Sequence, residues 1–326
     1  MRIFDDYTNR IKNVMQQPLY EHFEGRQRRQ PVLAAMRDAE WSKPLDSLIP
    51  LQQELGTTPN YSLPLGAHPD FSYISTSETV ERHYVASMFI DICNSTGLFR
   101  KYPPETVNYI TSVIQKAAMH VCLICGGYIQ RLHGDGMFVY FGRRGQEKRD
   151  AVQLGMLASS LVTYFVREEL PKLFEEDGIE RINTRIGFDF GDDDVVVWVK
   201  QGIGATSEVT TTSLHTSLAA KMQMSAANNG VVVGQHVLDI AGIETRFFTP
   251  VSQRTSKGPD AFIFPNYPAV GDGYRQYDFD WKAYLRSMNK FNQTPEGQLE
   301  LKRSSDRVLR PELVAPRAST VRPYRP

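Results

Sequence analysis

The sequence predicts an α+β fold, in which the elements follow the ferredoxin-like order β-α-β-β-α-β. Three observations predict it. Residues 85–90 form an almost unbroken apolar run, as expected of a strand that is covered on both faces. Residues 128–132 and 137–141 have the pattern of two strands joined by the tight turn Gly134-Asp135-Gly136. Residues 151–174 carry apolar side chains at helical spacing and are expected to cover one face of the sheet.

The other expected elements complete this order. A double proline at 103–104 is a helix start signal. In chain order, we expect a helix over 105–121, a strand pair at 182–190 and 195–199, a helix over 214–227 and a short strand at 230–234.

Composition divides the chain into three segments. Residues 1–75 are expected to form an N-terminal arm that begins with an amphipathic helix, continues as an irregular stretch rich in proline, and packs on its own domain or on a partner subunit. Residues 76–270 contain the predicted α+β domain. Residues 271–326 form a C-terminal extension, and its polar, arginine- and proline-bearing end is expected to be mobile.

Charge and hydropathy exclude several classes of partner. The chain has 326 residues, with 37 basic and 37 acidic side chains, so no global field favours nucleic acid or a membrane surface. We find no segment of bilayer-spanning length and no signal peptide, and the three cysteines fit buried thiols in a reducing compartment. We therefore expect a soluble, cytoplasmic protein. A local basic patch is expected to be a solvated loop, and it comprises Arg143, Arg144, Lys148 and Arg149.

Two aspartates stand out as a candidate site. Asp135 lies in the hairpin turn, between glycines that allow a ligand to approach closely. Asp91 ends a buried strand, where an acid needs a partner and a metal ion is an efficient one. The next residues, Asn94-Ser95-Thr96-Gly97, read as a turn into a helix whose N–H groups can receive phosphate oxygens. Together these features suit a two-metal phosphoryl-transfer centre. The alternative is a capping aspartate and a turn aspartate with no shared role.

Three motifs follow one another along the chain: Phe-x-Asp-Ile at 89–92, Gly-Gly-x-Ile-x-x-x-x-Gly-Asp-Gly at 126–136 and Arg-Ile-Gly-Phe-x-x-Gly at 185–191. Together they resemble the class III nucleotidyl cyclase catalytic domain. The similarity covers residues 84–265, and within the family the chain looks most like the bacterial pyrimidine cyclases of the anti-phage Pycsar systems. The resemblance implies attack of a nucleoside triphosphate's own 3′-hydroxyl on its α-phosphorus, with release of pyrophosphate and no covalent protein nucleophile.

The resemblance also implies how the metals and phosphates are bound. Asp91 and Asp135 match the two aspartates that hold a pair of Mg²⁺ or Mn²⁺ ions, and Ile92 adds a backbone carbonyl. One ion lowers the pKa of the 3′-hydroxyl, and the other binds the β- and γ-phosphates. Lys257 resembles the lysine that binds the triphosphate, although a plain solvated loop is the alternative there.

Base selection is expected at three positions. Arg131 stands where the family reads the base, and a side chain that only donates suits the carbonyl oxygens of uracil. Tyr84 would fill the space that a purine needs, with a core tyrosine as the alternative reading. Thr210 falls at the second base-selecting position if no gap intervenes. UTP is therefore favoured over CTP.

Two positions depart from the family pattern. Ser217 and Lys221 occupy the places of the transition-state asparagine and arginine, one helical turn apart. Serine can still hydrogen-bond the ribose, and lysine can still neutralise phosphate without the bidentate fork of arginine. Because metal and base residues lie on opposite faces of the family's cleft, the resemblance implies a head-to-tail homodimer with two equivalent sites.

The expected function is conversion of UTP to cUMP, an antiviral second messenger that a cyclic-nucleotide-sensing effector reads. Three alternatives stay open: a cytidylate cyclase, an adenylate cyclase with altered base contacts, and a degenerate cyclase domain that binds nucleotide as a regulator. A diguanylate cyclase is disfavoured, because the sequence has no Gly-Gly-Asp/Glu-Glu-Phe hairpin.

Overall fold

The computed structural model describes residues 2–16, 45–77, 79–254, 261–262, 273–295 and 297–302. The strands of the central sheet are β2 (Val85–Ile92), β3 (Tyr128–His133), β4 (Gly136–Phe141), β5 (Thr184–Gly191), β8 (Gly230–Gly234), β9 (Phe248–Pro250), β10 (Ala261–Phe262) and β11 (Tyr274–Phe279). The other strands are β1 (Glu81–Arg82), β6 (Val196–Ile203), β7 (Thr206–Ser213), β12 (Phe291–Gln293) and β13 (Leu299–Leu301).

The α-helices of the described residues are α1 (Asp5–Gln16), α3 (Ile49–Leu55), α4 (Ile74–Ser77), α5 (Ser95–Leu98), α6 (Pro104–Ile124), α7 (Lys148–Tyr164), α8 (Leu170–Glu175), α9 (Leu214–Ser225), α10 (Gln235–Ala241), α11 (Val251–Arg254) and α12 (Trp281–Ser287). Within the described parts of the chain, none of them combines the length and the apolar character that crossing a bilayer requires.

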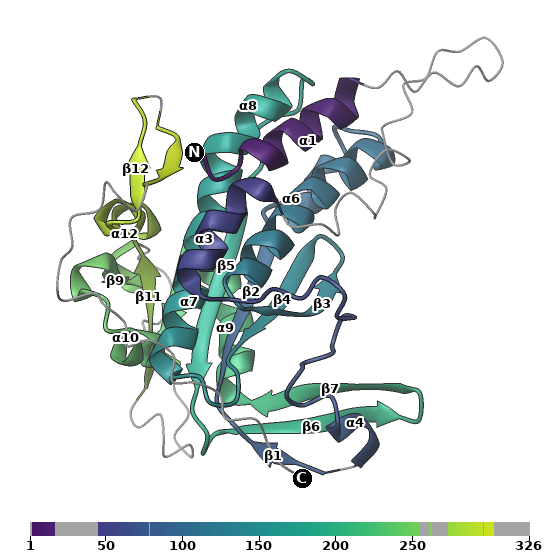
Figure 1. The fold of residues 1–326 in the computed structure, drawn as a ribbon, viewed down its shortest axis with the longest axis vertical. Helices are drawn as coiled ribbons and strands as arrows, with labels where there is room; N and C mark the ends of the chain where they lie inside the picture. The colour runs from purple at the N-terminus through teal and green to yellow at the C-terminus, as the bar shows by residue number, and fades with distance from the viewer. Residues whose placement is uncertain are drawn as a thin grey trace.

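The central sheet has the order β10-β11-β8-β5-β2-β4-β3, with β9 paired to β11 (Figure 1). Its β5-β2-β4-β3 portion is antiparallel throughout, α6 connects β2 to β3, and α7 connects β4 to β5. This confirms the ferredoxin-like arrangement. A further strand, β8, adds parallel to β5 after α9. The strands β1, β6 and β7 form a separate sheet, in which β6 and β7 extend as a long ribbon below the central sheet (Figure 1).

Helices α7 and α9 cover opposite faces of the central sheet. Adjacent residues of a strand point to opposite faces, and on β5 the ring of Phe188 meets Gly155 of α7, whereas Gly187 lies directly under α9. A Cβ atom at Gly187 would be 2.0 Å from the carbonyl oxygen of Ala219 and 2.3 Å from the amide nitrogen of Gln223. Glycine at this position therefore allows α9 to lie against the sheet backbone.

The strand register brings the two motif aspartates to the same end of the sheet. Ile90 of β2 pairs with Met137 of β4, so the next positions along this ladder are Asp91 and Gly136. His133 pairs with Gly136, which leaves a two-residue turn of Gly134 and Asp135 with Gly134 at φ 56°. The predicted Asp-Gly hairpin is confirmed, and its tip lies beside the end of β2.

The N-terminal segment packs on its own chain. The predicted first helix is present as α1, and the rings of Phe4 and Tyr7 lie 4.9 and 5.2 Å from that of Phe165. Helix α3 occupies part of the stretch that was expected to be irregular. Residues 17–44, and the predicted mobile end of the chain from 303 onward, lie outside the described residues.

Three expectations about secondary structure need correction. The predicted helix over 151–174 is divided into α7, a π-helical turn at Phe165–Glu169, and α8. The predicted strand pair at 182–190 and 195–199 is wrong as a pair, because β5 belongs to the central sheet and β6 pairs with β1 and β7. Strand β11, assigned by composition to the C-terminal extension, pairs with β8 in the central sheet. An apolar pattern identifies a strand but does not identify its partner.

Candidate functional site

Asp91 is held by two donors near the end of β2. Its Oδ2 atom accepts hydrogen bonds from the guanidinium of Arg185, at 2.7 Å, and from Nε2 of Gln223, at 3.0 Å. Arg185 lies opposite Asp91 on β5, whereas Gln223 reaches it from α9. The side chains of Asp91 and Arg185 are each 30% exposed, so this carboxylate remains open to a ligand.

The turn that carries Asp135 lies against the end of β2. A Cβ atom at Gly136 would be 2.9 Å from the carbonyl oxygen of Ile90 and 3.6 Å from Oδ1 of Asp91. Only glycine allows this close approach. Because consecutive Cα atoms are about 3.8 Å apart, the backbone of Asp135, the residue before Gly136, lies close to the end of β2 that carries Asp91.

The oxygen atoms at this place fit a divalent cation. One carboxylate oxygen of Asp135 is buried and has no hydrogen-bond partner among the described residues. The N–H of Cys93 donates to Asn183 beside β5, so the carbonyl of Ile92, in the same trans peptide unit, points the other way, toward the hairpin. Within the described ranges, no group of three or more His, Cys, Asp or Glu side chains is arranged so that it could hold a metal ion by itself. Magnesium is commonly held by one or two carboxylates together with substrate phosphates, and the donors present match that pattern.

The predicted turn after β2 is present, and it leads into the four-residue helix α5. Asn94 adopts a left-handed conformation, with φ 55°, and the N–H of Gly97 donates to its carbonyl at 2.9 Å. A Cβ atom at Gly97 would lie against Nδ2 of Asn94, so a side chain at position 97 would displace the side chain of Asn94. Ser95 and Thr96 complete the turn close to Asp91. Phosphate binding by these four residues stays a prediction.

Helix α9 presents different groups on its two sides. Ser217 and Lys221 are exposed and lie one turn apart, as predicted. Gln223, about 200° around the helix from Lys221, is only 9% exposed and contacts Asp91. Ser217 and Lys221 therefore point away from the acids of their own chain, so within one chain they are not part of the same site.

Arg131 has a partner that the sequence did not indicate. Its guanidinium forms an ion pair with Glu208 of β7, and both side chains are partly exposed, at 46% and 29%. Thr210, two residues farther along β7, is 8% exposed, and its hydroxyl lies 3.1 Å from that of Tyr140. Arg131 and Thr210 therefore lie in one region that also includes Glu208.

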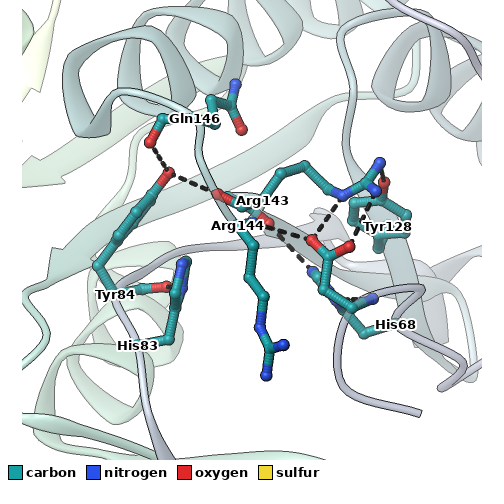
Figure 2. Close-up of polar contacts among 9 residues, drawn as sticks. His68, His83, Tyr84, Tyr128, Arg143, Arg144 and Gln146 are labelled. Carbon is teal, nitrogen blue, oxygen red and sulfur yellow. Dashed lines mark hydrogen bonds and ion pairs between the residues drawn. The ribbon is translucent and has the colours of Figure 1, made fainter. Parts of the chain in front are cut away.

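Tyr84 is a core residue. It is 4% exposed, and its hydroxyl donates to the carbonyl of Gln146 at 2.7 Å, with the carbonyl of Arg143 at 3.2 Å (Figure 2). Burial raises the pKa of this phenol above its usual range. The ring is packed in the core, and the hydroxyl is hydrogen-bonded to the chain's own backbone. The predicted contact of Tyr84 with the base is therefore not supported.

Three of the four residues of the basic patch, Arg143, Arg144 and Lys148, form ion pairs, which corrects the expectation of a solvated loop for these three. Arg143 donates to both carboxylate oxygens of Asp70, at 2.7 and 2.9 Å, and to Tyr128 (Figure 2). Burial raises the pKa of Asp70, but the hydrogen bonds from Arg143 and from the N–H of Arg144 outweigh it, so the pKa is lowered. Lys148 pairs with Asp193 at 2.6 Å. The contacts to Asp70 attach the N-terminal segment to the end of β4, away from Asp135.

His68 belongs to this cluster as a neutral ring. It is 1% exposed, its Nε2 lies 3.1 Å from the carbonyl of Gly142, and its Nδ1 accepts from the N–H of Asp70 (Figure 2). One nitrogen therefore donates and the other accepts, as in a neutral imidazole. Burial lowers its pKa to about 3.

Three residues of the site were not predicted. Arg185 stands in one of the three motifs, but its contact with Asp91 depends on the pairing of β2 with β5. Glu208 and Gln223 meet their partners only because β7 and α9 pack where they do. Lys257 lies outside the described residues, so its predicted contact with the triphosphate stays a prediction.

Comparison with known proteins gives related sequences and a shared fold. No protein-family model matches the chain. A cytidylate cyclase from Staphylococcus aureus is 35% identical over 232 residues, which cover 70% of this chain and 54% of the relative. A cytidylate cyclase from Escherichia coli is 28% identical over 254 residues, covering 76% of this chain and 54% of the relative. The chain thus spans about half the length of these curated relatives.

Among solved structures, the adenylyl cyclase CyaB from P. aeruginosa matches with a TM-score of 0.51 and 14% identity. The match covers 62% of this chain and 95% of that chain, so the two share a fold across nearly the whole of the solved domain.

Proposed function

The chain is related to the class III nucleotidyl cyclases and has their fold, and from that premise we propose that it converts a pyrimidine nucleoside triphosphate to the 3′,5′-cyclic monophosphate and pyrophosphate. The observation that supports this proposal is the strand register, which brings the hairpin turn of Asp135 beside the end of β2 that carries Asp91. The names of the curated relatives, which are cytidylate cyclases, support the class of substrate.

Metal binding is assigned to three groups of this chain: the carboxylates of Asp91 and Asp135, and the backbone carbonyl of Ile92. When bound, Mg²⁺ or Mn²⁺ supplies Lewis acidity that lowers the pKa of the 3′-hydroxyl and neutralises charge on the phosphates. The guanidinium of Arg185 and the amide of Gln223 orient the carboxylate of Asp91.

The triphosphate is assigned to groups that surround these acids. Arg185 supplies positive charge at the end of β5, and the turn Asn94–Gly97 offers backbone N–H groups at the end of β2. Ser217 and Lys221 lie on the exposed side of α9, and we propose that they serve the site of a second copy of this chain. The resulting head-to-tail homodimer has two equivalent composite sites.

For base choice we propose CTP ahead of UTP, which revises the preference that Arg131 alone suggested. Arg131 only donates, and it suits the acceptor atoms O2 and N3 of cytosine. Glu208, its ion-pair partner, only accepts when ionised, and it suits the exocyclic amine of cytosine. Uracil presents a carbonyl oxygen where cytosine presents that amine, and a carboxylate repels a carbonyl oxygen. Thr210 lines the same region, with its hydroxyl shared with Tyr140.

The cellular role stays a proposal that rests on the resemblance to the Pycsar cyclases. In this proposed role, the cyclic nucleotide is an antiviral second messenger that is made in the cytoplasm. A separate effector that senses cyclic nucleotides binds this messenger.

The test is product identification from an equimolar mixture of the four nucleoside triphosphates with Mn²⁺. We expect cCMP to dominate in a mass spectrum, together with equimolar pyrophosphate, and we expect no product from Asp91→Ala. Asp278→Ala is the matched control, because Asp278 is also a strand aspartate with an arginine 2.7 Å away, yet lies on β11. Mainly cAMP would favour the adenylate alternative, and nucleotide binding without pyrophosphate release would favour a regulator. Full activity in Asp91→Ala would refute the metal assignment.

A further inference from the structure

Two glutamine side chains contact the surroundings of the paired acids from opposite faces of the sheet. Gln223 of α9 donates from Nε2 to Oδ2 of Asp91 at 3.0 Å. Gln115 of α6 donates from Nε2 to the carbonyl of Gly134, in the turn of Asp135, at 2.9 Å. One neutral amide therefore supports each acid, although the two helices lie on different sides of β2 and β4.

The two carboxylate oxygen atoms of Asp91 have different surroundings. Oδ2 accepts from both Arg185 and Gln223, whereas Oδ1 lies 3.6 Å from the Cβ position of Gly136 and so faces the turn. Two donors on one oxygen fix the plane of the carboxylate. This leaves Oδ1 on the side of the carboxylate that faces the hairpin turn.

Gln223 cannot easily move, because the backbone of α9 lies directly on β5. The Cβ position of Gly187 is 2.3 Å from the amide nitrogen of Gln223 and 2.0 Å from the carbonyl oxygen of Ala219. The side chain of Gln223 is also almost fully buried, at 9% exposed. The position of its amide is thus set by the packing of α9 on the sheet.

Gln115 acts on the backbone that carries the second acid. A two-residue turn at the tip of a hairpin has few contacts of its own. Besides the bond to Gly134, Nε2 of Gln115 lies 3.4 Å from the carbonyl of Gly136, so one amide spans both residues that flank Asp135. The turn is thereby tied to α6.

We propose that Gln115 and Gln223 are positioning residues that set Asp135 and Asp91 at the separation a divalent cation requires. The inference rests on the proposed function, since it takes Asp91 and Asp135 as metal ligands. Neither glutamine bonds to the ion or to the substrate. Groups that orient metal ligands in this way typically change metal affinity or activity by about 10- to 100-fold when they are removed.

The test uses the full chain with Gln223→Met and Gln115→Met, which keep the length of the side chain and remove the amide. Free Mn²⁺ is followed by electron paramagnetic resonance during a titration, and the Mn²⁺ concentration for half-maximal turnover is measured in parallel. We expect each variant to need about 10-fold more Mn²⁺ in both measurements, while kcat at saturating Mn²⁺ falls much less. Gln153→Met is the control, because Gln153 donates to the carbonyl of Ala241 from α7, outside the site.

The outcomes separate the two proposals. Unchanged Mn²⁺ requirements in both glutamine variants, with a kcat loss no greater than in Gln153→Met, would overturn the positioning role while leaving the cyclase proposal intact. Failure of the wild-type protein to bind Mn²⁺ would overturn both. If Gln223→Met does not fold, Gln115→Met tests the inference by the same criterion, because the side chain of Gln115 is partly exposed.

Discussion

Arg131 of β3 and Glu208 of β7 form an ion pair, which sets a donor and an acceptor side by side at the proposed base position. A lone arginine would match the carbonyl oxygens of uracil, but the pair also offers an acceptor for an amine. The pairing joins strands of two different sheets. In the proposed function, base choice therefore depends on how the β6–β7 ribbon lies against the central sheet.

Glu208→Gln is expected to lower the preference for CTP over UTP. The uncharged amide accepts the cytosine amine less strongly and no longer repels O4 of uracil, so the ratio of kcat/KM values for CTP and UTP should fall by about 10-fold, corresponding to roughly 1–2 kcal/mol. Glu81→Gln is the matched control, because Glu81 pairs with Arg144 at similar exposure, 26% and 47%. An unchanged ratio in Glu208→Gln would show that Glu208 takes no part in selecting the nucleobase.

Asp135→Asn is expected to reduce turnover by about 100-fold or more, because a bound metal contributes several kcal/mol to stabilising the transition state, while leaving the free energy of unfolding close to that of the wild type. One of its carboxylate oxygens is buried without a partner among the described residues, so folding loses little when its charge is removed. Initial rates and urea denaturation measure the two effects. A large loss of stability with normal turnover would assign Asp135 to the turn alone.

Gly187→Ala is expected to destabilise the protein by about 3 kcal/mol or more, because the added methyl group would overlap the backbone of α9. The shift of α9 should also weaken Mn²⁺ binding through Gln223. Gly178→Ala serves for comparison, because a Cβ atom at Gly178 would meet nothing within 4 Å. Its only expected loss of stability, about 1–2 kcal/mol, comes from placing alanine at a backbone φ of 67°. Urea midpoints for the two variants should differ accordingly, and equal midpoints would contradict the close packing.

Acid is expected to weaken the fold through His68. Its pKa is lowered to about 3 by burial, while the unfolded chain has the ordinary value of 6.5. The contribution of neutral His68 is therefore complete above pH 6.5 and is lost as the pH falls toward 3, by up to about 1.4 kcal/mol per pH unit.

The charge of Asp70 favours the protonated form of His68, whereas the charges of Arg143 and His83 oppose it. Unfolding free energies of the wild type and of His68→Gln, measured from pH 7 to pH 4.5, should converge as the pH falls. Parallel curves would mean that His68 is not buried as a neutral ring.

Tyr84→Phe is expected to cost about 1–2 kcal/mol of stability, because the carbonyl of Gln146 loses its donor. The product ratio from mixed triphosphates should not change, since the hydroxyl faces the chain's own backbone. A changed ratio would restore Tyr84 to the base pocket.

Local patterns in the sequence were sufficient for much of the fold. The apolar run before Asp91, the Asp-Gly turn and the helical spacings identify strands and helices from residues that are neighbours in the chain. They also pointed to Asp91 and Asp135, because both acids sit at the ends of recognisable elements. They misassigned the partner of β6 and left Tyr84 between core and site, since burial depends on segments far away in the sequence.

By itself, then, the sequence determined the order of elements and the pair of acids, because a periodicity or a turn is a property of adjacent residues. Only the tertiary structure decided that Arg185 and Gln223 share one oxygen of Asp91, that Glu208 meets Arg131, and that Tyr84 is enclosed. Each of these contacts joins segments whose register and packing are set by the whole core, and no local pattern specifies that register.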